Sequence, residues 1–133
     1  ISGAEAGCQA EIGSAAAMSA AALVYLHGGS PWQMAQAVAI ALKNMMGLVC
    51  DPVAGLVEVP CVKRNVAGAM NALSAAELAL AGIESRIPTD EVIDAMRAVG
   101  EALPSALRET GRGGVAASPT AVAFRENFFG KQA

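Results

Sequence analysis

The sequence has little charge and no basic cluster. Charged residues make up only 16% of its 133 residues, the formal net charge is −3, and Lys and Arg are scattered along the chain with Lys63 and Arg64 as the one adjacent pair. Nucleic-acid-binding surfaces need clustered positive charge, so the composition argues against a nucleic-acid partner. Hydrophobic residues account for 54% of the chain. That apolar content separates the sequence from disordered proteins, and its length predicts a single folded domain over residues 1–133.

Signals for a sheet, a membrane span and secretion are also missing. No segment alternates between apolar and polar residues as a half-buried strand does. The charge-free part of each of the first two predicted helices, residues 12–27 and 31–42, is shorter than the roughly 20 residues of a membrane-spanning helix, and it is rich in Ala. There is no basic and apolar leader. We therefore expect no membrane partner. Since Ile1 lies in a predicted loop, we also expect the chain to be a fragment of a longer protein.

What is present is a series of Ala-rich segments with helical spacing. Apolar residues recur every three or four positions, and Gly or Pro marks the segment ends. Ser30 and Pro31 form an N-cap and a first-turn proline, and Thr89 is predicted to cap a later helix. The pattern predicts an all-α fold, a compact bundle of about four to six Ala/Gly-rich helices. The expected helices span 11–27, 31–46, 62–81, 89–103 and, last and shortest, 119–130.

The three cysteines lie at predicted helix ends. Cys8 precedes the first helix, and Cys50 and Cys61 belong to an ordered loop, residues 48–61, whose two prolines and glycine forbid a continuous helix. Backbone N–H groups at such places stabilise thiolates. An odd number of cysteines argues against a disulfide framework and favours a reducing cytoplasm. Their spacing matches neither a zinc finger nor a ferredoxin, so spacing alone leaves structural cysteines and ligands equally open.

The residues around the cysteines carry a more specific signal. Residues 2–13 read SGAEAGCQAEIG, residues 48–61 read LVCDPVAGLVEVPC, and KRN follows at 63–65; LRET at 107–110 and a Gly pair at 113–114 come later. These motifs, in this order, resemble those of the iron-sulfur L-serine dehydratases over most of residues 1–120. The chain also continues past Gly114 without a further cysteine, which is similar to the α chain of two-chain members.

The resemblance implies a [4Fe-4S] cluster held by Cys8, Cys50 and Cys61, with one iron left free for substrate. It implies an L-serine ammonia-lyase in which that iron acts as a Lewis acid on the serine hydroxyl while a base removes the Cα proton. Loss of water gives aminoacrylate, which hydrolyses to pyruvate and ammonia without pyridoxal phosphate. It also implies an oligomer, a β chain or β domain, and an earlier α segment. The catalytic base then lies outside residues 1–133, and the fragment is expected to be inactive alone.

Several polar residues are candidates for supporting the ligands or contacting substrate, and each of them also has a purely structural explanation. The candidates near the cysteines are Gln9, Glu11, Lys63, Arg64 and Asn65. Carboxylates near a helix start are favoured by the helix dipole alone, and the Lys63–Asn65 run can equally be a solvated first turn.

Two further candidates have simpler explanations. His27, the sole histidine, ends a helix, where a cation complements the dipole, and Arg112 with its two glycines can be an ordinary turn. The alternative to the enzyme is a non-catalytic helical module with structural or zinc-binding cysteines.

Overall fold

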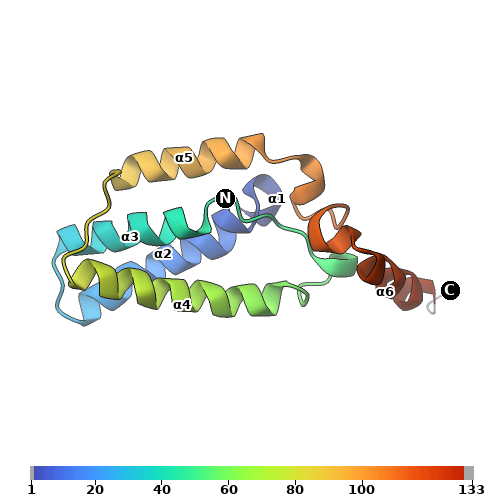
Figure 1. The fold of residues 1–133 in the computed structure, drawn as a ribbon, viewed down its shortest axis with the longest axis horizontal. Helices are drawn as coiled ribbons and strands as arrows, with labels where there is room; N and C mark the ends of the chain where they lie inside the picture. Colours follow the sequence, from blue (N-terminus) through green and yellow to red (C-terminus); the bar gives the residue numbers. More distant parts are fainter. Residues whose placement is uncertain (1, 131–133) are drawn as a thin grey trace.

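The computed structural model describes residues 2–130 and shows four long helices lying along one another (Figure 1). They are α2 (Cys8–Leu26), α3 (Pro31–Met45), α4 (Cys61–Leu80) and α5 (Thr89–Ala102). Helix α2 packs on α3 and α4, and α5 packs mainly on α3. Within residues 2–130 the only β-type pairing is an isolated bridge between Cys50 and Arg108. The predicted all-α bundle is confirmed.

Short helical segments surround the end of the bundle where α2 and α4 begin. A four-residue helix, α1 (Gly3–Ala6), precedes α2 and was not predicted. The loop of residues 48–61 contains a 3-10 turn, η1 (Val53–Gly55), and two more turns, η2 (Ser105–Leu107) and η3 (Gly114–Ala117), follow α5. The last helix, α6 (Pro119–Gly130), extends away from the bundle (Figure 1).

The predicted helix boundaries hold with two corrections. Helix α3 begins with a capping box between Ser30 and Gln33, as the sequence indicates. The first long helix starts at Cys8, three residues earlier than predicted, so Cys8 lies inside the first turn rather than before it. The prediction of Thr89 as a cap is wrong. Pro88 holds that position, and the Thr89 hydroxyl donates instead to the Ala35 carbonyl, 2.9 Å away on α3.

The core between α2, α3 and α4 is built mostly of alanine. Its buried members include Ala16, Ala20, Ala37 and Ala75, with a few larger side chains such as Val24. Small side chains let helix backbones approach closely. The closeness is visible at Gly68 of α4, where an added Cβ would lie 2.6 Å from the Ile12 side chain of α2. This close approach brings the starts of α2 and α4 to the same end of the molecule.

Large apolar side chains remain exposed on several helices. On α4, Val62, Val66 and Met70 are each more than half exposed and recur at four-residue spacing along one face. Patches of this kind on soluble proteins commonly mark interaction surfaces. None of the helices described for residues 2–130 is both long and apolar enough to cross a membrane.

Candidate functional site

Three thiols come together at the end of the bundle where α2 and α4 begin. Cys8 is the first residue of α2, Cys61 is the first residue of α4, and Cys50 lies in the loop between α3 and η1. All three are free and buried, with exposed fractions of 2% for Cys8, 5% for Cys50 and 9% for Cys61. Cys8 and Cys50 pack together with Ile12. The two helix starts point backbone N–H groups toward this region, which favours negatively charged sulfur.

The first segment fits closely against the Cys50 loop because it contains two glycines. An added Cβ on Gly3 would lie 3.1 Å from both the Cys50 Sγ and the Glu11 Oε2. Gly7 joins α1 to α2 with a φ of +76°, and its Cβ would lie 2.7 Å from the Leu48 carbonyl oxygen. Both a left-handed backbone and a close approach require glycine there. The motif therefore places Cys8 against the loop through backbone contact.

Backbone hydrogen bonds hold Cys50 from both sides. The Cys50 N–H donates to the Leu107 carbonyl at 2.9 Å, and the Glu109 N–H donates to the Cys50 carbonyl at 2.8 Å. The Gln9 N–H of α2 donates to the Leu48 carbonyl at 2.9 Å. Cys50 is thus fixed between the start of α2 and the segment after α5, although both are distant in sequence.

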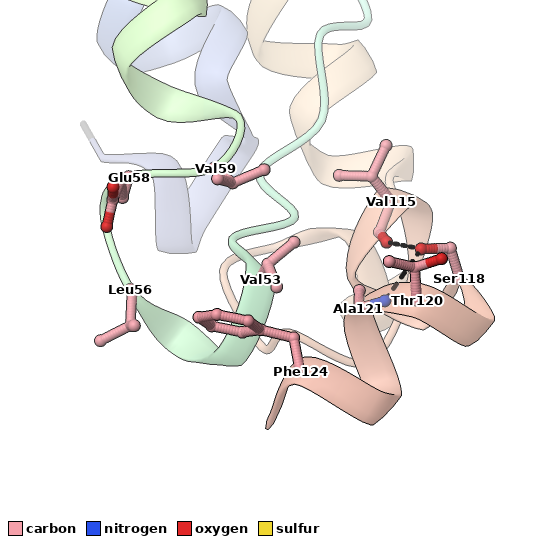
Figure 2. A pocket seen from close by; sticks show the side chains of 9 residues that line it. All are labelled: Val53, Leu56, Glu58, Val59, Val115, Ser118, Thr120, Ala121 and Phe124. Carbon is pink, nitrogen blue, oxygen red and sulfur yellow. Dashed lines mark hydrogen bonds between the residues drawn. The ribbon is translucent and has the colours of Figure 1, made fainter. Parts of the chain in front are cut away.

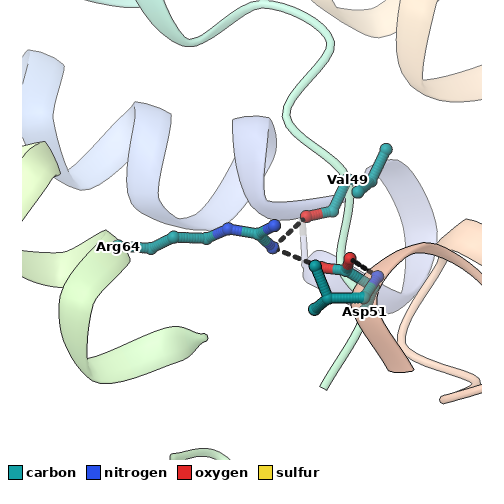
Figure 3. A network of polar contacts seen from close by, with 4 residues as sticks. Val49, Asp51 and Arg64 are labelled. Atoms are coloured by element: carbon teal, nitrogen blue, oxygen red, sulfur yellow. Dashed lines mark hydrogen bonds and ion pairs between the residues drawn. The ribbon is translucent and has the colours of Figure 1, made fainter. Parts of the chain in front are cut away.

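A buried ion pair next to Cys50 connects the loop to α4 (Figure 3). Asp51 is 2% exposed, and its Oδ1 accepts from Arg64 Nη1 at 2.5 Å. The same Nη1 donates to the Val49 carbonyl at 2.8 Å, and the Val115 N–H donates to Asp51 Oδ2 at 2.7 Å. Arg64 is also within hydrogen-bonding reach of the Cys8 thiol. One guanidinium therefore links the segments that carry two of the thiols.

Comparison with known proteins shows the family of this chain. The model of the serine dehydratase alpha chain family matches residues 1–116. The chain belongs to this family. It is 66% identical over 130 residues to a probable L-serine dehydratase alpha chain of Bacillus subtilis and 55% identical over 128 residues to the L-serine dehydratase alpha chain of Peptoniphilus asaccharolyticus. It is 47% identical over 117 residues to L-serine dehydratase 1 of Escherichia coli. The expected family resemblance is confirmed.

The matched regions differ in extent among the relatives of this serine dehydratase alpha chain. The alignments cover 98% and 96% of this chain for the Bacillus and Peptoniphilus proteins and 87% for the Escherichia protein. The chain spans 43%, 44% and 26% of these relatives, respectively. Relatives named as an alpha chain align over 128–131 residues, whereas relatives whose names carry no chain designation align over 117.

The structure brings some of the sequence candidates to the thiols and leaves others outside. Arg64 lies at the site, and the Glu11 carboxylate lies beside Gly3 and contributes to the electrostatics at Cys61. Gln9 is 1% exposed, but its side chain is used internally: Nε2 donates to the Met96 carbonyl and Oε1 accepts from the Gly47 N–H. It therefore ties α2 to α5 and to the end of α3.

Lys63 and Asn65 are exposed on the first turns of α4. Asn65 lines a hollow between α2 and α4 together with Ile12 and Gly68. His27 caps the opposite end of α2, where its Nδ1 lies 2.8 Å from the Leu23 carbonyl oxygen, consistent with the structural alternative. Arg112 is exposed in the segment between η2 and η3. The roles first considered for these residues stay predictions.

Asp51 and Gly3 were not singled out as functional residues from the sequence. The sequence signal for Asp51 is its position directly after Cys50 in a loop. A carboxylate next to a buried thiol is itself expected to be buried, and a buried carboxylate needs a charged or hydrogen-bonding partner. Its partner Arg64 is distant along the chain, and the contact follows only from the packing of α4. Gly3 is recognisable only once Cys50 is known to lie against it.

Burial makes two of the metal-free thiols, Cys50 and Cys61, weaker acids. It raises the pKa of the Cys50 thiol to about 12, and Cys8, Glu109 and Cys61 act in the same direction. Burial followed by the charge of Cys8 also raises the pKa of Cys61, although Arg64 opposes the rise. At neutral pH the sulfur atoms of Cys50 and Cys61 carry protons, so any metal that binds them must displace those protons.

The Cys50 pKa predicts how the metal-free chain responds to alkali. Its ordinary pKa is 9.0, so the unfolded chain loses this proton first as the pH rises. The stability from the protonated thiol is fully present below pH 9 and is lost progressively as the pH approaches about 12. Urea unfolding of the reduced chain, compared with Cys50→Ala, should show a stability difference that changes across this range. A difference that stays constant with pH would contradict the assignment.

Proposed function

We propose that this chain is part of an L-serine dehydratase, an L-serine ammonia-lyase, and that Cys8, Cys50 and Cys61 hold its [4Fe-4S] cluster. The observation that carries the proposal is the meeting of three buried, reduced thiols from three separate segments at two helix starts. Membership of the serine dehydratase alpha chain family supports L-serine as the substrate.

The donor set fits an iron-sulfur cluster better than a single metal ion. Iron-sulfur clusters prefer thiolate ligands, and each ligand thiolate binds a different iron, so the sulfur atoms lie further apart than around one ion. Among residues 2–130, no group of three His, Cys, Asp or Glu side chains is arranged to hold a single metal ion. Support for a cluster comes from the all-thiolate donor set and from the family of the chain.

When bound, the cluster would supply an iron without a cysteine ligand, which acts as a Lewis acid on the substrate hydroxyl. The residues of this chain hold the three sulfur atoms, and the Cys50 loop covers them so that they are shielded from water. Burial raises the pKa of Cys61, and the positive charge of Arg64 opposes that rise, which favours thiolate over thiol at this ligand. The base that removes the Cα proton belongs to a segment outside residues 1–133.

The rest of the enzyme is a partner in this proposal. The alpha-chain names of the Bacillus and Peptoniphilus relatives imply a separate β chain, and the chain spans less than half of each of those relatives. Exposed apolar residues on α4 support burial of that face in a larger assembly, and we propose an oligomer. We also propose that the enzyme is cytoplasmic, because free thiols and an oxygen-sensitive cofactor suit a reducing compartment.

The test is anaerobic assembly of the full-length α chain with its β chain, iron and sulfide, followed by measurement of pyruvate formed from L-serine. We expect activity that depends on iron and is insensitive to hydroxylamine, which inactivates pyridoxal phosphate enzymes. A correctly assembled complex that copurifies with zinc and releases no pyruvate would contradict the proposal and favour the non-catalytic module.

A further inference from the structure

Helix α6 is set apart from the four-helix bundle. It extends beyond the end of the bundle, and its main contacts are with η1 and η3 rather than with the long helices (Figure 1). Only Ala121 of this helix is buried. Three of its side chains are phenylalanines, Phe124, Phe128 and Phe129, with exposed fractions of 49%, 40% and 48%. The chain has no other phenylalanine.

The phenylalanines form one continuous apolar surface. The rings of Phe124 and Phe128 stack with centroids 5.9 Å apart, and Phe128 meets Phe129 edge to face at 5.2 Å. Rings in these geometries hold one another in place. Aromatic residues, Phe among them, are enriched in the cores of protein interfaces. Rings that already contact one another lose little side-chain entropy when a partner covers them.

An open apolar hollow of about 350 Å³ adjoins this surface (Figure 2). Phe124 forms one of its walls, and Val53, Val59 and Val115 form others. In Figure 2 the ring of Phe124 lies beside Val53, on the side of the hollow opposite Ser118. Glu58 and Thr120 add polar groups to the lining. The hollow is large enough to accept an apolar side chain from another protein.

The lengths of the alignments with relatives indicate which protein binds at this hollow. Relatives named as an alpha chain match this chain over 128–131 residues, whereas relatives without a chain designation match over 117. The family model ends at residue 116, before α6 begins at Pro119. The additional 11–14 matched residues are close in number to the 12 residues of α6. This helix therefore accompanies the division of the enzyme into separate chains.

We propose that α6 and the adjoining hollow bind the separate β chain of the enzyme, with the three phenylalanines covered by an apolar surface of that chain. The inference rests on the proposed function, because it takes the partner from the two-chain form of the enzyme. A fused enzyme needs no such contact, since its segments are joined covalently and already at high effective concentration. Two separate chains need an interface of their own.

The location of the hollow connects this contact with the thiol site. The Val53 N–H donates to the Val59 carbonyl within the loop that runs from Cys50 to Cys61. The Val115 N–H donates to Asp51, the residue after Cys50. A β chain seated in the hollow would therefore contact both segments that hold the Cys50 loop in place. Binding of the partner would restrict that loop.

The test uses the full-length α chain and the β chain, with affinity measured by titration calorimetry and assembly by native mass spectrometry. The double variant Phe128→Ser, Phe129→Ser should weaken α–β binding roughly tenfold or more, because two interface aromatics are lost. Thr120→Arg, which puts a bulky charge at the mouth of the hollow, should weaken it as well. Unchanged affinity in both variants would overturn the inference.

A matched control is Trp32→Ser. Trp32 is 63% exposed and is the second residue of α3, whose start lies at the other end of the bundle (Figure 1). This variant should bind the β chain as wild type does, and all variants should keep wild-type thermal stability as isolated α chains. If the phenylalanine variant instead disrupts α–α association and leaves β binding intact, the occupant is a second copy and the proposal is wrong. Complex formation without dehydratase activity would refute the proposed function while supporting the docking site.

Discussion

Replacing Cys50 with alanine in the full-length α chain should abolish the [4Fe-4S] cluster. We expect anaerobic reconstitution to give roughly four irons per wild-type chain and close to none in Cys50→Ala, with the visible absorption of the cluster lost. Two remaining thiols cannot hold a cluster that the wild-type protein binds through three. Dehydratase activity should fall to background, and Cys8→Ala and Cys61→Ala should behave in the same way.

The control must separate loss of a ligand from loss of packing. Ile12 is buried against Cys8 and Cys50 and offers no ligand atom. Ile12→Val removes one methyl group from the same cluster of side chains, at a stability cost of about 1 kcal/mol. It should retain the iron. A cysteine variant that keeps four irons and full activity would show that its sulfur is not a ligand, whereas iron loss in Ile12→Val would show that packing alone accounts for the effect.

The helices were predictable because their boundaries are set locally. Ser30 and Gln33 form a capping box within one turn, and the glycines after α2 and α4 provide the left-handed backbone that ends a helix. Such signals need no knowledge of the rest of the chain. The short helix α1 was missed because four residues are too few for a periodic pattern. The Thr89 prediction failed because its hydroxyl found a partner on a different helix, Ala35.

The site was predictable only in part, because its geometry depends on contacts between segments that are far apart in the sequence. The spacing of Cys8, Cys50 and Cys61 does not show that they meet, and the motif resemblance supplied that expectation. Their convergence depends on the close contact of α2 with α4 at Gly68 and Ile12. The pairing of Asp51 with Arg64 and the internal use of the Gln9 amide likewise depend on tertiary packing. Sequence patterns identify residue types but not these long-range partners.

Removing the Asp51 carboxylate should lower the free energy of unfolding by about 3 kcal/mol. Of the effects that we expect, this is the second largest. Asp51→Ala would leave the guanidinium of Arg64, whose side chain is 19% exposed, without its counter-charge. It would also leave the Val115 N–H without an acceptor. Gly114 shows how closely the carboxylate is enclosed, because a Cβ there would overlap Asp51 Oδ2. The melting temperature should fall by roughly 10 °C.

The Asp94–Arg97 pair on α5 provides a matched control, since it is also a carboxylate–guanidinium pair but both side chains are 67% exposed. Asp94→Ala should change stability by less than about 0.5 kcal/mol, because solvent screens the pair. A double-mutant cycle with Arg64→Met tests the mechanism: if the loss in Asp51→Ala comes from the uncompensated guanidinium, then adding Arg64→Met should recover part of it. Equal losses in Asp51→Ala and Asp94→Ala would show that burial does not strengthen the Asp51 pair. In that case the Cys50 loop would be held by its backbone hydrogen bonds to Leu107 and Glu109 rather than by the ion pair.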